Sequence, residues 1–190
     1  MSNAKGQDMD GGSPDQDTRY QQAAAQFGPA LERLARAYER DADLARDLLQ
    51  DIHLALWRSL DTFDGRCGLR TWVFRVAHNT GASHALRQRQ SRLAAPAASL
   101  DELAETPALA DTPEQAADRR RTLDRLYDLI RRLKAPDRQV ILLYLEGEDA
   151  AAIGEVTGLS PGTVATKIHR AKAVLARHFQ PEQPHKGGQP

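Results

Sequence analysis

The chain has 190 residues, of which 41% are apolar and 27% charged, so it can hold one medium domain or two small ones. Its 26 basic and 26 acidic residues cancel to a formal net charge of zero, which at first argues against a nucleic-acid-binding protein. The single Cys67 excludes an intramolecular disulfide and a cysteine-rich zinc site, and the lack of a long apolar run excludes a signal peptide or membrane helix, so we expect a cytoplasmic protein.

The zero net charge conceals a segregation of charge along the chain. No acid occurs between Gly65 and Leu100, a stretch with six arginines, or between Leu159 and Gln180. Acids precede each of these blocks, from Glu39 to Asp51 and from residue 146 to residue 155. This pattern indicates two surfaces of opposite sign in each half, one for a basic protein partner and one for an anionic polymer. Ordinary solvated faces of a helical protein explain it about equally well.

Three segments lack any apolar period. Residues 1–19 are polar and rich in Gly, Asp and Gln, and residues 181–190 are similar, so we expect both to be disordered tails. Residues 93–119 carry Pro96, Pro107 and Pro113 among alanines and acids. That composition predicts a flexible linker with at most a short helical turn.

The first half reads as three helices. Leu31, Leu34 and Tyr38 share a helix face, and a second stripe repeats every four residues from Leu44 to Leu56, after a break near residues 41–43. The segment "LDTFDGRCG" then interrupts the pattern with two glycines. A third helix is expected from residues 69–71 onward, its buried stripe formed by Leu69, Trp72, Val73 and Val76.

The second half reads as four helices and has no strand alternation of useful length. The first carries Leu123, Leu126, Ile130 and Leu133, the second runs from near Pro136 to Gly147, and shorter ones cover residues 149–157 and residues from Pro161 onward. We therefore predict an all-α fold with two small helical domains, residues 20–92 and 120–180, joined by the linker.

The stretch from Ala150 to Ile168 has the spacing of a helix-turn-helix. Ile153 and Val156 face inward from its first helix, and Gly154 allows the two helices to cross closely. Gly158 supplies the left-handed residue of the turn, and the inward anchors on the other side are Leu159, Val164 and Ile168. A plain helical hairpin is the less favoured alternative.

The second helix of this motif is built to approach phosphates. Ser160 is a good N-cap and Pro161 suits the first helical position, so the positive end of the helix faces outward there. Its outward face carries Thr163, Thr166, Lys167 and Arg170. Lys and Arg pair with guanine edges or phosphates, and Thr with a base edge or a thymine methyl.

The segment from Asp47 to Gln90 carries Asp47, Leu48, Gln50, Asp51 and Trp57 in one helix, then Phe63 and Gly65, Thr71 and Trp72, and Ala77 and Asn79. In these residues it resembles region 2 of the extracytoplasmic-function (ECF) class of sigma-70 factors. The helix-turn-helix resembles region 4 of the same class through Gly162 to Val164 and His169 to Ala171. The two motifs occur in the family's order and together cover about residues 20–90 and 120–179.

The resemblance implies a dissociable initiation factor that binds core RNA polymerase and promoter DNA, and that has no cofactor, no metal and no catalytic residue. It implies an anti-sigma protein as a further partner. The implied polymerase contacts are Asp47, Gln50, Asp51 and Leu54. Contacts with melted minus-10 DNA, one base of which is held outside the duplex, would come from Phe63, Arg75, Asn79, Ser83 and Arg87. Contacts with the minus-35 duplex would come from Ser160, Thr163, Thr166, Lys167 and Arg170. Trp57 and Trp72 are expected in the core.

Two other functions fit the sequence less well. A polymerase-independent helix-turn-helix regulator would leave the acidic helix and the arginine-rich helix unexplained. An all-α enzyme is not supported, because the sequence shows no set of catalytic residues: the histidines form no metal-ligand pair with a carboxylate and no triad-like set. We also hypothesise that the two domains pack together in the inactive protein, with the acidic face of one against the basic face of the other.

Overall fold

The computed structural model describes residues 14–91, 97–105 and 119–179. Within these ranges the chain forms eight helices and no strand, which confirms the all-α prediction. The predictions for residues 1–13 and 181–190, and for linker residues 92–96 and 106–118, lie outside the described residues.

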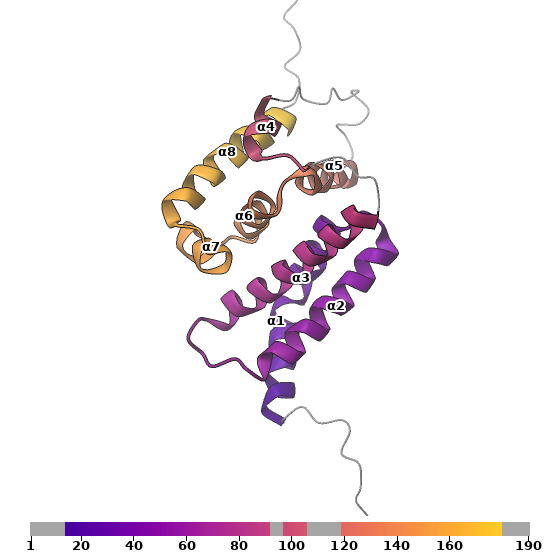
Figure 1. Cartoon of the computed structure of the whole chain (residues 1–190), viewed down its shortest axis with the longest axis vertical. Helices are drawn as coiled ribbons and strands as arrows, with labels where there is room; N and C mark the ends of the chain where they lie inside the picture. Colours follow the sequence, from indigo (N-terminus) through magenta and orange to yellow (C-terminus); the bar gives the residue numbers. More distant parts are fainter. Residues whose placement is uncertain (1–13, 92–96, 106–118, 180–190) are drawn as a thin grey trace, which may run out of the picture.

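The first half is a bundle of three helices, each packed on the other two: α1 (Pro14–Tyr38), α2 (Ala42–Leu60) and α3 (Leu69–Ser91) (Figure 1). The expected break at residues 41–43 is present, because the Asp41 carboxylate caps α2 by accepting from the N–H groups of Asp43 and Leu44. The repeat every four residues becomes the buried stripe of α2, formed by Ala45, Leu48, Ile52, Leu56 and Leu60.

The first helix begins at Pro14, so residues 14–19 are helical where we expected a disordered tail. Long-range contacts hold these turns on α2 and the segment that follows it. The Asp17 carboxylate accepts a hydrogen bond of 2.8 Å from Trp57 Nε1, the Gln16 amide donates to Trp57 O at 2.8 Å, and Arg19 donates to Phe63 O at 3.3 Å. Polar partners distant in sequence leave no apolar period, so the start of α1 was not predicted.

The second half contains α5 (Arg119–Arg132), α6 (Ala135–Leu145), α7 (Ala150–Thr157) and α8 (Pro161–Phe179). The last two form the predicted helix-turn-helix. Gly158 has a φ of +76° in the turn, and a Cβ on Gly154 would lie 2.8 Å from the Leu159 carbonyl oxygen. Both glycines are therefore required for the geometry that the sequence indicated.

Part of the expected linker is folded onto the second half. Residues 100–105 form a short helix, α4 (Leu100–Glu105), that packs on α8. Ahead of it, Ala98 N–H donates to Arg132 O and Ala98 O accepts from Lys134 N–H, each at 2.8 Å. The two halves also share one apolar core, in which side chains of α1 to α3 meet side chains of α5, α6 and α8.

Candidate polymerase and nucleic-acid interfaces

The exposed face of α2 carries all four residues predicted to contact polymerase. Asp47, Gln50 and Asp51 are exposed, and Leu54 is an exposed large apolar residue, at 46%. The face thus combines two carboxylates, an amide and a leucine side chain, none of which is buried in the core. Such a surface suits a partner that offers basic groups around an apolar patch.

The residues predicted to contact melted DNA separate into two groups. Arg75, Asn79, Ser83 and Arg87 follow one another at intervals of one turn along α3, and Asn79, Ser83 and Arg87 are exposed. Phe63, in contrast, packs on Trp72 with ring centroids 5.3 Å apart and is only partly accessible. The structure therefore brings four of the five into one stripe and places Phe63 beside the start of α3.

The two tryptophans behave as largely buried anchors. Trp72 Nε1 donates to Ser59 Oγ at 3.0 Å, and Trp57 Nε1 donates to Asp17. Each indole N–H therefore has a protein partner, and neither ring is fully exposed. For Trp72, which packs against the apolar core, this agrees with the expectation of a core role. Trp57 is partly accessible and contacts the start of α1 through Asp17 and Gln16.

The predicted minus-35 face lies along α8, and its polar groups already have partners inside the chain. Ser160 caps the helix, accepting from Thr163 N–H at 3.3 Å, and Thr166 Oγ1 donates to Gly162 O at 3.0 Å. Lys167 forms an ion pair with Asp137 of α6, and Arg170 forms one with Asp101 of α4 at 2.9 Å. A duplex that approached this face would meet both cations paired with carboxylates.

The N-terminal start of α3 is covered by acidic residues of the second half. Arg70 pairs with Glu148 and donates to Glu146 O at 3.2 Å. Arg75 donates to Glu155 O at 2.6 Å, and Thr71 contacts the Glu155 carboxylate at 3.2 Å. These contacts place the acidic segment between α6 and the end of α7 on the basic start of α3, the packing that we hypothesised from the charge blocks.

A second set of contacts joins α1 to the second half. The Arg33 guanidinium donates two hydrogen bonds to the Glu146 carboxylate, at 2.7 and 2.6 Å, and this bidentate pairing raises the pKa of Arg33. Arg131 donates to Arg36 O at 2.7 Å, at the end of α1.

Buried polar residues lie where α1, α3 and α6 meet. The Arg138 guanidinium lies over the Tyr38 ring, 4.8 Å from its centroid, and burial lowers the pKa of Arg138 to about 10. Tyr38 Oη lies 3.2 Å from Nδ1 of the fully buried His78. Nearby, His84 Nε2 lies 3.1 Å from a Glu39 carboxylate oxygen.

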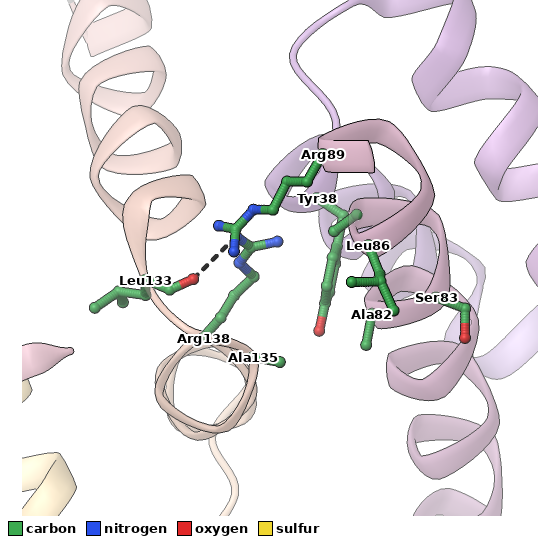
Figure 2. A pocket seen from close by; sticks show the side chains of 9 residues that line it. Tyr38, Ala82, Ser83, Leu86, Arg89, Leu133, Ala135 and Arg138 are labelled. Carbon is green, nitrogen blue, oxygen red and sulfur yellow. Dashed lines mark hydrogen bonds between the residues drawn. The ribbon is translucent and has the colours of Figure 1, made fainter. Parts of the chain in front are cut away.

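A cavity of about 310 Å³ opens beside this network, between α3 and the start of α6. Figure 2 shows Tyr38, Leu86 and Arg89 on one side and Leu133 and Arg138 on the other. Ser83, predicted to contact DNA, lies at its edge.

The sequence did not reveal the acids that hold α8. Asp137 reads as an ordinary acid in the first turn of a helix, yet it is 4% exposed and accepts from both Leu100 N–H and Lys167 Nζ. Asp101 lies in the segment that composition marked as linker. The sequence does show a segment without acids in α8 that follows an acidic segment. This charge pattern indicates that ion pairs could form, but it does not tell which residues pair.

Neither a metal site nor a membrane span was found in the described part of the chain. No group of three or more His, Cys, Asp or Glu residues among residues 14–91, 97–105 and 119–179 could hold a metal ion. No helix in these ranges is long and apolar enough to cross a bilayer.

The fold and the two faces define a class of protein: a helical DNA-binding factor in which a helix-turn-helix accompanies a three-helix bundle with an acidic face. Two family descriptions match the chain, Sigma-70 region 2 over residues 24–92 and Sigma-70 region 4 over residues 123–175. The RNA polymerase sigma factor CnrH of Cupriavidus metallidurans is 32% identical over 162 residues, which cover 82% of this chain and 83% of the relative. The ECF RNA polymerase sigma factor SigW of Bacillus subtilis is 26% identical over 147 residues, or 72% and 75% of the two chains.

Solved structures show the same fold. The structure of CnrH in complex with the cytosolic domain of CnrY aligns with a TM-score of 0.61 and 23% identity. The alignment covers 90% of this chain and 100% of the other chain. The sigma factor RpoE in complex with the anti-sigma factor NepR from Bartonella quintana aligns with a TM-score of 0.61 and 22% identity, covering 86% and 98%.

The chain belongs to the ECF class of the sigma-70 family. It is a promoter-specific transcription initiation factor, and the alternative of a polymerase-independent regulator is not favoured. The family is one of non-enzymatic initiation factors.

Proposed function

We propose that residues 20–92 bind core RNA polymerase and the melted minus-10 element, and that residues 120–180 bind the minus-35 duplex. The observation that carries this proposal is the presence, in one chain, of an unobstructed acidic face on α2 and a helix-turn-helix whose second helix begins with a capped, outward N-terminus. The first face fits a basic protein and the second fits a phosphate backbone.

In this assignment Asp47, Gln50, Asp51 and Leu54 contact the polymerase. Asp47 forms no ion pair among the described residues, and the Asp51 carboxylate lies 3.8 Å from Arg87, a loose exposed pair that costs little to break. The exposed Leu54 supplies apolar area that would be desolvated in the complex.

The stripe of Arg75, Asn79, Ser83 and Arg87 on α3 would track the melted strand, with arginines on phosphates and short polar side chains on a flipped base. The packing of Phe63 on Trp72 supports a role for Phe63 in shaping the loop beside the strand. Because Arg75 donates to Glu155 O, the second half must move before the strand reaches the start of this stripe.

On α8, Ser160, Thr163, Thr166, Lys167 and Arg170 would contact the minus-35 duplex. The helix start offers the positive end of the helix dipole to a phosphate. Thr163 and Thr166 are exposed and lie one turn apart, close enough to read neighbouring base edges.

The compact arrangement corresponds to the inactive protein, in which the acids of α6 and α7 cover the basic start of α3. A cytoplasmic location and the absence of catalysis follow from the family membership. An anti-sigma protein is the expected further partner, because one of the similar solved structures holds a sigma factor with an anti-sigma factor.

The test is a run-off transcription assay with bacterial core RNA polymerase and a library of promoter fragments. We expect promoter-specific transcripts from the wild-type chain, and their loss with Asp47→Arg, which reverses charge on α2, and with Arg170→Ala, which removes a cation from α8. Asp124→Arg, an exposed charge reversal on α5, is the control and should leave the transcripts unchanged.

A protein that yields no transcripts but binds an operator duplex by itself would contradict the proposal. Polymerase binding that survives Asp47→Arg and Asp51→Arg together would contradict the assignment of α2 alone.

A further inference from the structure

One flank of α8 is covered by α4, a helix from the segment that joins the two halves. Asp101 of α4 pairs with Arg170 at 2.9 Å, and Arg177 Nη2 donates to Leu103 O at 2.6 Å. Arg170 and Arg177 are two turns apart on α8, so α4 lies along the helix instead of touching it at one point. The covered flank includes a residue that we assign to the minus-35 duplex.

The apolar side of α4 fits this position. Leu100 and Leu103 are 2% and 4% exposed and join the core that contains Ala171 and Val174 of α8. Both leucines are thus almost completely removed from water, which favours the docked state. The helix itself is capped, with Glu102 N–H donating to Ser99 Oγ at 3.3 Å.

A buried carboxylate links α4 to a second cation of α8. Asp137 accepts from Leu100 N–H at 3.0 Å through one oxygen and from Lys167 Nζ through the other. Docked α4 therefore helps to fix the Asp137 carboxylate that pairs with Lys167. Two of the cations assigned to the duplex, Lys167 and Arg170, are thus both held in an arrangement that includes α4.

We propose that α4 is an internal ligand of α8 that competes with the minus-35 duplex, the Asp101 carboxylate taking the place of a DNA phosphate on Arg170. This rests on the proposed role of α8 in DNA binding. A carboxylate and a phosphate oxygen accept the same charge-assisted hydrogen bonds from a guanidinium, so Arg170 bound to one is withheld from the other.

The strength of the contact suits a competitor and not a permanent block. The side chains of Arg170 and Asp101 are 48% and 62% exposed, so water and salt weaken their pairing. A duplex that neutralises several cations at once gains more than this one pair loses. Because α4 must be displaced first, the full chain binds DNA more weakly than α8 without α4 would.

The experiment measures binding of the full chain to a fluorescein-labelled, random-sequence DNA duplex by anisotropy at low salt. We expect Asp101→Asn to bind about two- to fivefold more tightly than wild type, the size of an exposed ion pair, and the gain to shrink as salt is added. Leu103→Ser, which loosens α4 without changing charge, should also tighten binding. Asp43→Asn makes the same charge change on α2, where Asp43 pairs with Arg46, and should have no comparable effect.

Amide hydrogen exchange gives a second readout that does not depend on affinity. Residues 98–105 should be protected in the free chain and lose protection when the duplex is added. Equal affinities of wild type and Asp101→Asn, with Arg170→Ala weakening both, would overturn the competition while leaving the role of α8 in DNA binding intact. Duplex binding that Arg170→Ala does not weaken would overturn both.

Discussion

His78, one of two buried histidines on α3, makes the stability of the protein depend on pH. Burial, and then the nearby Arg138 guanidinium, lower the pKa of His78 to about 3, from 6.5 in an unfolded chain. As pH falls below 6.5 the unfolded chain takes up a proton that the folded chain refuses until far lower pH, so stability is lost with falling pH.

We expect His78→Gln to remove this contribution, which is at most about 1.4 kcal/mol between about pH 7.5 and about pH 5.5. The measurement is urea unfolding at both pH values. The loss on acidification should be smaller in His78→Gln than in wild type, and unchanged in His169→Gln, whose side chain is exposed. Equal losses in wild type and His78→Gln would show that His78 does not stay neutral in the fold.

The close approach of the two helix-turn-helix helices depends on one glycine. A Cβ at position 154 would lie 2.8 Å from the Leu159 carbonyl oxygen, a backbone atom that cannot turn aside as a side chain can. We expect Gly154→Ala to lower the free energy of unfolding by about 1–3 kcal/mol, despite the better helix propensity of Ala.

Gly162→Ala is the matched control, because nothing lies within 4 Å of a Cβ built there. It should leave stability unchanged or raise it by about 0.4–1 kcal/mol. Thermal unfolding of both variants decides the matter, and a Gly154→Ala protein as stable as wild type would mean that α7 and α8 cross less closely than the structure shows.

At the residue scale, the sequence indicated residues whose role is local. Gly158 and Ser160 were placed by turn and cap chemistry that involves residues within one turn of the chain. The partners of Asp137, Arg138 and Glu39 were not predicted, because a charged residue buried by a distant element looks in the sequence like an exposed one. The assignments of polymerase and minus-10 contacts came from the family resemblance, those on α8 also from helix-turn-helix spacing, and all stay predictions.

At the scale of elements, one arginine ties the end of α5 to the start of α6. Arg138 donates to the carbonyl oxygens of Ile130 at 3.2 Å, Arg131 at 2.6 Å and Leu133 at 3.0 Å. These carbonyls lie at or just beyond the end of α5, where helical N–H partners run out, and Ile130 O also accepts from the Leu133 N–H at 3.1 Å. The side chain thus acts as the C-cap of α5 while its own charge is buried.

We expect Arg138→Met to lower the free energy of unfolding by about 2–4 kcal/mol, since several buried acceptors lose their donor. Arg132→Met, an exposed arginine at the end of the same helix, should change it by less than about 0.5 kcal/mol. Chemical denaturation of the two variants is the comparison, and losses of similar size would contradict the capping role.

The helices themselves were largely predictable, because each has an apolar stripe that periodicity reveals. The bounds of α2, α7 and α8 agree with the predicted breaks at residues 41–43, Asp149 and Pro161. The early start of α1 and the docking of α4 were not predicted, since both depend on tertiary contacts in segments of polar or linker-like composition.

At the scale of the whole molecule, polar contacts across the junction accompany the shared core. Arg33 of α1 and Glu146, which follows α6, form the bidentate pair there, and the Glu146 side chain is only 18% exposed. A partly desolvated pair of this geometry contributes more than an ordinary surface pair. Reversal of one charge would place two carboxylates in contact across the junction.

We therefore expect Arg33→Glu to favour separation of the two halves, and Arg33→Glu combined with Glu146→Arg to restore the compact form. Small-angle X-ray scattering should give a larger radius of gyration for the single variant and the wild-type value for the double variant. Arg46→Glu on α2 should leave the radius unchanged, because its only described pair is with Asp43 in the same helix. If the Arg33→Glu protein scatters like wild type, the shared apolar core and the remaining polar contacts hold the halves together without this pair. Release of the basic start of α3 to DNA would then require a partner to separate that junction.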